Sequence, residues 1–106
     1  MIETKTPAQL VDQYIEAFTA FLSGDSERRR HCADLRREIA AQVGDSTWLL
    51  HCVEEKVKGV LRAERSLRQE GLNKWAVNAW SAARSKAVWS LEANRDLLVI
   101  QLEGRN

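Results

Sequence analysis

Two His–Cys pairs are the residues of this sequence that come nearest to a metal site. His31–Cys32 and His51–Cys52 each follow a Gly-Asp-Ser triplet, and imidazole and thiolate are ligands that zinc prefers. Adjacent helical side chains diverge by about 100°, so each pair can direct only one ligand to a shared point. In a helical hairpin, Cys32 and Cys52 also lie too far apart along the axis for a disulfide. We therefore expect no metal and no cofactor, with Cys32 in the core, both histidines in solvent, and each triplet ending one helix and capping the next.

Glu64 is a carboxylate in the middle of an apolar helical stripe, a position that can raise a pKa and serve acid–base chemistry. Arg84 and Arg95 fall on the core-facing side of the last helix, so an internal Glu–Arg ion pair that fixes helix register is the favoured interpretation. No Ser-His-Asp set, phosphate-binding glycine loop or paired-carboxylate motif can be assembled from the other residues. We expect no catalytic residues and no enzymatic activity.

A cluster of arginines occupies one side of the second predicted helix. Its members are Arg29, Arg30, Arg36 and Arg37. Such a cluster can follow a phosphate backbone, which makes a small nucleic-acid-binding regulator the alternative function. No aromatic residues lie between these arginines, and Arg30 can pair with Asp34 one turn along the helix. We therefore predict a solvated charged face.

Length and composition define the class of protein. A chain of 106 residues with 44% hydrophobic residues can form one domain with its own core. Sixteen basic against fifteen acidic residues leave a net charge of +1, which gives no overall attraction to nucleic acid or to an anionic membrane. No apolar run approaches the ~20 residues that cross a bilayer, and the N-terminus has no signal-peptide pattern. We expect a single cytoplasmic domain over residues 1–106 that does not bind a membrane.

Helix start and stop signals divide the chain. Thr6 and Pro7 form an N-cap and a first helical position, and the glycines at 24, 44 and 71 end successive apolar-periodic segments. The predicted helices span residues 7–23, 26–43, 46–70 and 73–102. Because the connections are short, sequential helices should be antiparallel neighbours. The predicted fold is all-α, an antiparallel bundle of about four helices with a long C-terminal helix.

The C-terminal helix has two apolar faces. One, the predicted inner face, comprises Val77, Trp80, Ala83, Ala87, Val88, Leu91, Leu98 and Leu102. The other, which we call the outer face of this helix, comprises Trp75, Ala79, Ala82, Trp89, Ala93, Leu97 and Ile100, with Lys86, Ser90 and Gln101 on one flank. A helix that is apolar on two sides is either enclosed by a large core or packed against a second body. The outer face therefore predicts a homodimer interface, a surface for another protein, or a surface covered by the first helix.

In size, helix count, lack of a catalytic motif and apparent need to dimerise through a long helix, the chain resembles the small helical anti-activators of bacterial quorum sensing. The resemblance implies a dimeric regulatory protein that binds a LuxR-type transcription factor and blocks its dimerisation or DNA binding. A helical subunit of a phage or secretion assembly is a further alternative, and would form higher or open-ended oligomers.

Overall fold

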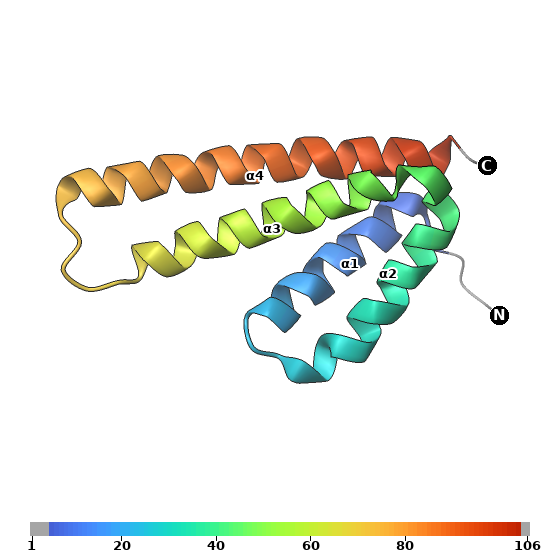
Figure 1. Cartoon of the computed structure of the whole chain (residues 1–106), viewed down its shortest axis with the longest axis horizontal. Coiled ribbons are helices and arrows are strands. Elements are labelled where there is room, and N and C mark those ends of the chain that lie inside the picture. The colour runs from blue at the N-terminus through green and yellow to red at the C-terminus, as the bar shows by residue number, and fades with distance from the viewer. Residues whose placement is uncertain (1–4, 105–106) are drawn as a thin grey trace.

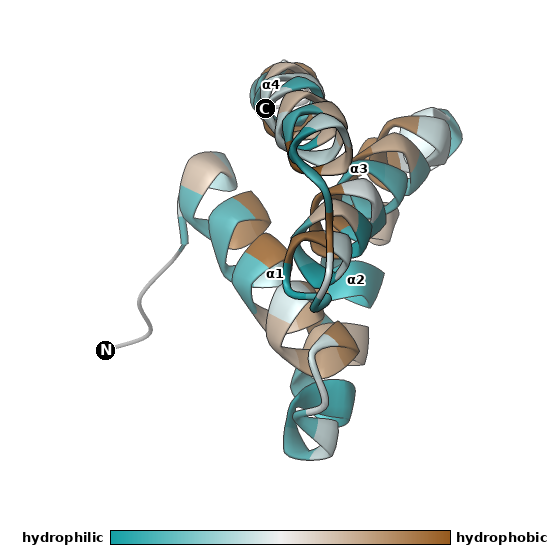
Figure 2. Ribbon diagram, turned by 90° about the vertical axis from the view of Figure 1, so that its left-hand side faces the viewer, coloured by the Kyte–Doolittle hydropathy of each residue, from teal (hydrophilic) through white to brown (hydrophobic). Residues whose placement is uncertain are grey.

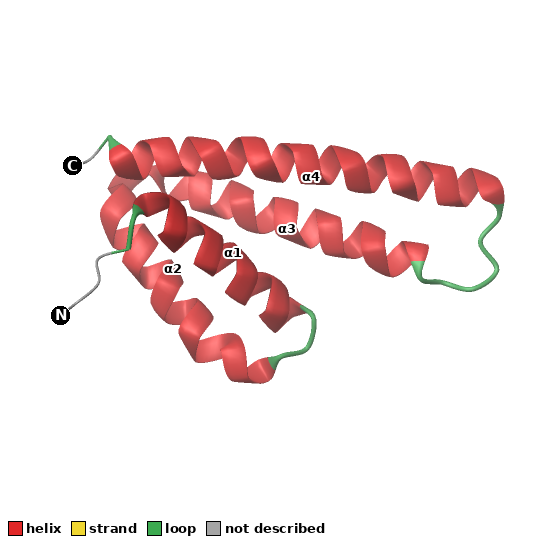
Figure 3. Ribbon diagram, turned by 180° about the vertical axis from the view of Figure 1, so that it is seen from behind, coloured by secondary structure: helices red, strands yellow, loops and turns green. Residues whose placement is uncertain are grey.

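The computed structural model describes residues 5–104, and these residues form helices joined by short connections, with no strand among them (Figures 1 and 3). The helices are α1 (Pro7–Leu22), α2 (Arg29–Val43), α3 (Thr47–Leu67) and α4 (Lys74–Glu103), with 3-10 turns at Ser26–Arg28 and Gly44–Ser46. The predicted all-α class is confirmed. None of the helices within residues 5–104 combines the length and apolar character needed to cross a membrane.

The two capped helix starts follow the sequence signals. Thr6 and Gln9 form a capping box before α1, in which the Gln9 N–H donates to Thr6 Oγ1 (3.2 Å) and the Thr6 N–H donates to Gln9 Oε1 (3.0 Å). Asn73 caps α4 by accepting the Ala76 N–H at 2.8 Å. These bonds satisfy backbone donors that a helix leaves free in its first turn. The segment 97–102, which is locally as strand-like as helical in sequence, continues α4 to Glu103.

The predicted role of the Gly-Asp-Ser triplets as ends and caps is only half correct. Gly24 and Gly44 do follow helices with positive φ values of 112° and 55°, which glycine adopts without strain. However, neither Asp25 nor Ser46 makes a side-chain capping bond, and each triplet leads into a 3-10 turn instead. α2 and α3 therefore begin later than predicted, at residues 29 and 47, and α3 ends at Leu67, not at residue 70.

The helices do not form an even bundle. α3 and α4 form one long antiparallel hairpin, and the shorter hairpin of α1 and α2 packs against only one end of it (Figure 1). The chain measures 53 × 29 × 23 Å, with a radius of gyration of 15.6 Å, against about 13 Å for a compact domain of this length. We call residues 58–90 the arm; this part of the hairpin extends away from α1 and α2, and only the end of α1 reaches its beginning. Residues 5–57 with 91–104 are the core end.

Nearly all burial lies at the core end. The main cluster of buried side chains draws on all of α1 to α4 and comprises Leu10, Val11, Tyr14, Ala17, Cys32, Leu35, Ile39, Val43, Leu49, Leu50, Val53, Leu98, Val99 and Leu102. In the arm, Ala63 is the one fully buried residue. The predicted inner face of α4 is therefore right in its second half, where Leu98 and Leu102 are buried. In its first half the prediction is only partly right, because Trp80 is half-buried whereas Val77 and Ala83 are exposed. α1 and α2 are too short to reach that far along α4.

Candidate functional site: the outer face of α4

A buried polar cluster lies inside the core end. Glu54 of α3 is 8% exposed and accepts hydrogen bonds from the Tyr14 hydroxyl of α1 and from Arg36 of α2, whose Nε lies 2.9 Å from Glu54 Oε2. A second Arg36 nitrogen lies 3.4 Å from the other carboxylate oxygen. One carboxylate thus joins three helices, and within residues 5–104 every buried side-chain nitrogen and oxygen atom has a hydrogen-bond partner. The sequence gives little signal for this cluster, because its members are 40 and 18 positions apart.

Burial and this carboxylate determine the titration of the neighbouring groups. Burial, then the hydrogen bond to Glu54, raises the pKa of the Tyr14 hydroxyl far above its usual value. Burial and the negative charge of Glu54 raise the pKa of the Cys32 thiol, so Cys32 stays a neutral core thiol. The cluster can hold three helices in register, which is the role that sequence analysis assigns to Glu64.

Glu64 itself lies in the arm, where it pairs with Arg84. Arg84 Nε is 3.7 Å from Glu64 Oε2, and the two side chains remain 46% and 31% exposed. The predicted pair therefore exists, but the prediction that it is internal is wrong. Arg95, the other candidate partner, instead donates two hydrogen bonds of 2.9 Å to Asp12 of α1. These bonds raise the pKa of the Arg95 guanidinium and connect α4 to α1.

The two His–Cys pairs do not converge. Cys32 is buried, Cys52 is half-buried and both are free thiols, while His31 and His51 are exposed, as predicted. His51 lies beside acidic residues of its own helix, with Nδ1 4.0 Å from Glu54. Among the residues that the structure describes, no three His, Cys, Asp or Glu side chains come together as metal ligands would.

Two of the four clustered arginines on α2 are held by carboxylates. Arg36 is bound to the buried Glu54, and Arg37 lies 3.4 Å from Asp34, which sequence analysis pairs with Arg30. The charged groups of this helix are therefore partly neutralised by acidic neighbours. A second basic feature, not identified from sequence, is a cleft of about 220 Å³ between the end of α1 and the middle of α3, lined by Leu22, Lys58, Leu61, Arg62 and Arg65.

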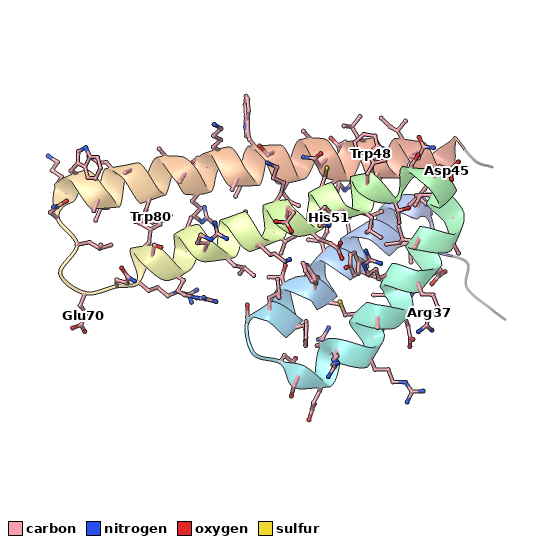
Figure 4. The ribbon with its side chains drawn as sticks, viewed as in Figure 1. Arg37, Asp45, Trp48, His51, Glu70 and Trp80 are labelled. Atoms are coloured by element: carbon pink, nitrogen blue, oxygen red, sulfur yellow. The ribbon has the colours of Figure 1, made fainter. Side chains whose placement is uncertain are left out.

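The α4 outer face is exposed along its whole length. Trp75 is 78% exposed, Trp89 80%, Ile100 63% and Leu97 51%, and the three alanines between them are exposed as well. Seen along the long axis, α4 lies at one edge of the molecule with the other helices to one side of it (Figure 2). Trp80, by contrast, points from α4 towards α3 and is half-buried (Figure 4). The alternative in which the first helix covers the outer face is therefore wrong.

Lys86 lies within this face, so the prediction that it lies on the flank of the face is wrong. α4 is continuous from 74 to 103, and eleven residues at 100° each bring Lys86 to within about 20° of the direction of Trp75. Lys86 also lines a shallow depression of about 500 Å³ beside Trp89, together with Ser85, Ser90 and Ala93. The face thus consists of two apolar halves with a cation at its centre.

Comparison with known proteins gives no relative to guide assignment, since no family model, no curated protein sequence and no solved structure matches this chain.

Proposed function

We propose that this protein acts without catalysis, by binding another protein chain through the α4 outer face. The observation that carries the proposal is the exposure of Trp75 and Trp89 at 78% and 80%, in line with Ile100, on a helix that its own chain covers on one side. Monomeric proteins rarely expose a contiguous apolar patch larger than a few hundred Å². Tryptophans surrounded by small residues are also the composition that contributes most to binding free energy at interfaces.

The regulatory form of this proposal follows from the resemblance to quorum-sensing anti-activators. In that form, the protein captures a LuxR-type transcription factor in a stoichiometric complex and so prevents its dimerisation or DNA binding. The elongated shape supports capture of a helical surface, because the outer face runs for about 38 Å between Trp75 and Ile100. An amphipathic helix of a partner could lie along it in the way that helices dock into apolar grooves.

Photo-crosslinking in the native cells tests whether the face binds protein. A photoreactive phenylalanine analogue replaces Trp89, and a matched control places it at Arg37, whose side chain is 79% exposed on α2. We expect covalent adducts from position 89 and not from position 37, with mass spectrometry identifying the captured chain. Equal adducts from both positions, or none from position 89, would contradict the proposal.

A second experiment tests the anti-activator form alone. The protein is added to a host LuxR-type factor bound to its promoter DNA, and release of the DNA is measured by fluorescence anisotropy. We expect release at an equimolar ratio, lost when Trp89 and Ala82 are both replaced by Glu. The control is Ala41→Glu, which introduces the same charge at an exposed alanine of α2. If no LuxR-type factor of the host released its DNA, the anti-activator form would be wrong. The more general proposal of protein binding would then be decided by photo-crosslinking.

A further inference from the structure

The spacing of the α4 outer face is that of a helix that pairs with another helix. Along α4, steps of four and three residues alternate through Trp75, Ala79, Ala82, Lys86, Trp89 and Ala93, and continue through Asp96 to Ile100. Alternation of four and three is the heptad spacing of a seam buried between two helices. The small alanines allow two helix axes to approach closely, while the tryptophans and Ile100 provide the large side chains that fill the spaces between them.

From this pattern we infer that the occupant of the α4 outer face is a second copy of this chain, paired antiparallel through α4. The inference rests on the proposed function only in taking this face as a protein-binding surface. With the twofold axis at the level between Ala87 and Val88, every position of the seam meets a position of the opposite heptad type, as antiparallel helix pairs require. The facing pairs are then Trp75 with Ile100, Ala79 with Asp96, Ala82 with Ala93, and Lys86 with Trp89.

Charge decides between the antiparallel and the parallel arrangement. A parallel pair would place Lys86 against its own copy and Asp96 against its own copy, which is unfavourable at both levels. In the antiparallel pair, the two copies of Asp96 are about 26 Å apart along the axis. The two copies of Lys86 lie in adjacent layers, and each is placed over the Trp89 ring of the other chain, where a cation–π contact is favourable. Asp96 faces Ala79, and its carboxylate keeps its bond of 3.0 Å to Arg95 of the same chain.

The area of the face suits such a dimer. At about 80% exposure, Trp75 and Trp89 together leave about 400 Å² of side-chain surface in solvent in each copy. With Leu97, Ile100 and the alanines added from both copies, the pair would bury on the order of 1,200 Å², where stable protein interfaces begin. The α1–α2 hairpins would lie at opposite ends of the dimer, because each covers only the C-terminal half of its own α4. A regulatory partner would then compete with the second copy for this face.

Disulfide trapping tests both the occupant and its orientation. Two full-length variants carry Ala82→Cys or Ala93→Cys, both at exposed positions, in a background with Cys52→Ser. Cys32 is kept because it is buried in the core. Each variant is oxidised alone and as an equimolar mixture, and covalent dimers are measured on a non-reducing gel.

We expect the mixture to form at least about tenfold more covalent dimer than either variant alone. Antiparallel pairing brings residue 82 of one chain opposite residue 93 of the other, but separates two copies of residue 82 by about 16 Å, beyond disulfide reach. Efficient linkage of either variant to itself would overturn the antiparallel arrangement. Absence of linkage in all three samples would overturn the second copy as occupant, whereas photo-crosslinking from position 89 to another protein would still support the proposed function.

Discussion

The core end and the arm share the helices α3 and α4, yet these helices are stabilised differently in the two regions. At the core end, α3 and α4 are packed against α1 and α2, and the buried cluster includes side chains from all of them. In the arm, the same helices pack mainly against each other, with only the end of α1 beside them at the cleft that Leu22 lines, and Ala63 alone is fully buried. Since helices in proteins depend mostly on tertiary packing for their stability, the core end carries the fold. The arm and the outer face of α4 are where a second chain would add the most.

Truncation of matched leucines gives the largest expected difference between the two regions. Leu50 of the core end is 0% exposed, and Leu50→Ala should lower the free energy of unfolding by about 3 to 5 kcal/mol, because it leaves a cavity. Leu61 in the arm is half-buried, and Leu61→Ala should cost at most about 1 kcal/mol. Urea unfolding at low protein concentration measures both values. Equal losses would mean that the arm is as well packed as the core end.

The two Glu–Arg pairs offer a comparison of polar interactions. Glu54→Ala removes the carboxylate that binds the Tyr14 hydroxyl and should cost about 2 to 3 kcal/mol, since that hydroxyl stays buried without a partner. Glu64→Ala breaks the half-exposed pair with Arg84, and should cost less than about 1 kcal/mol. Thermal unfolding of both variants provides the values. A larger loss for Glu64→Ala would reverse the assignment of the stabilising cluster to the core end.

Alkaline pH should weaken the core end through Tyr14. Its pKa is raised in the folded chain above the usual 10.0, so from about pH 10 upwards the unfolded chain loses the hydroxyl proton while the folded chain keeps it. The contribution of this group is therefore complete below pH 10 and falls as pH rises, by about 1.4 kcal/mol per pH unit. Unfolding titrations between pH 8 and pH 11, compared with Tyr14→Phe, isolate the effect. The same slope in Tyr14→Phe would assign the alkaline loss to other groups.

Gly59 provides the smallest and most local test, within the arm. A Cβ atom at this position would lie 3.7 Å from the Ala87 side chain, an ordinary contact, so the approach of α4 to α3 leaves room here for a methyl group. Gly59→Ala should stabilise the chain by about 0.5 to 1 kcal/mol through helix propensity. Gly59→Leu should lose that gain, because the larger side chain pushes α4 away. Circular dichroism melts distinguish these outcomes, and a destabilising Gly59→Ala would mean that the helices lie closer than the structure has them.

Sequence patterns predict local structure here better than they predict coverage. In α2, apolar residues recur every three or four positions at Cys32, Leu35, Ile39 and Val43, and all of them are buried, because this helix packs on one side only. Glu54 was missed, since a carboxylate beside Val53 gives no sign of a tyrosine that approaches from 40 positions away. The incomplete burial of the first half of the inner face of α4 could have been predicted by comparing helix lengths. α1 has 16 residues and α4 has 30, so the signal was present in the predicted boundaries. The central position of Lys86 likewise follows from the helical period alone.

Molar mass in solution tests most directly whether the α4 outer face binds a second chain. Sedimentation equilibrium gives the molar mass of the wild-type protein, the Ala82→Glu/Trp89→Glu variant and the Ala41→Glu control. Each is measured at protein concentrations from micromolar to several hundred micromolar. For the wild type and the control, the mass should rise to twice the monomer value of 12.1 kDa, while the doubly substituted variant stays at the monomer value with unchanged helicity. A wild-type mass of 12.1 kDa throughout, or a variant that doubles its mass as readily as the control, would contradict the pairing of two copies through this face.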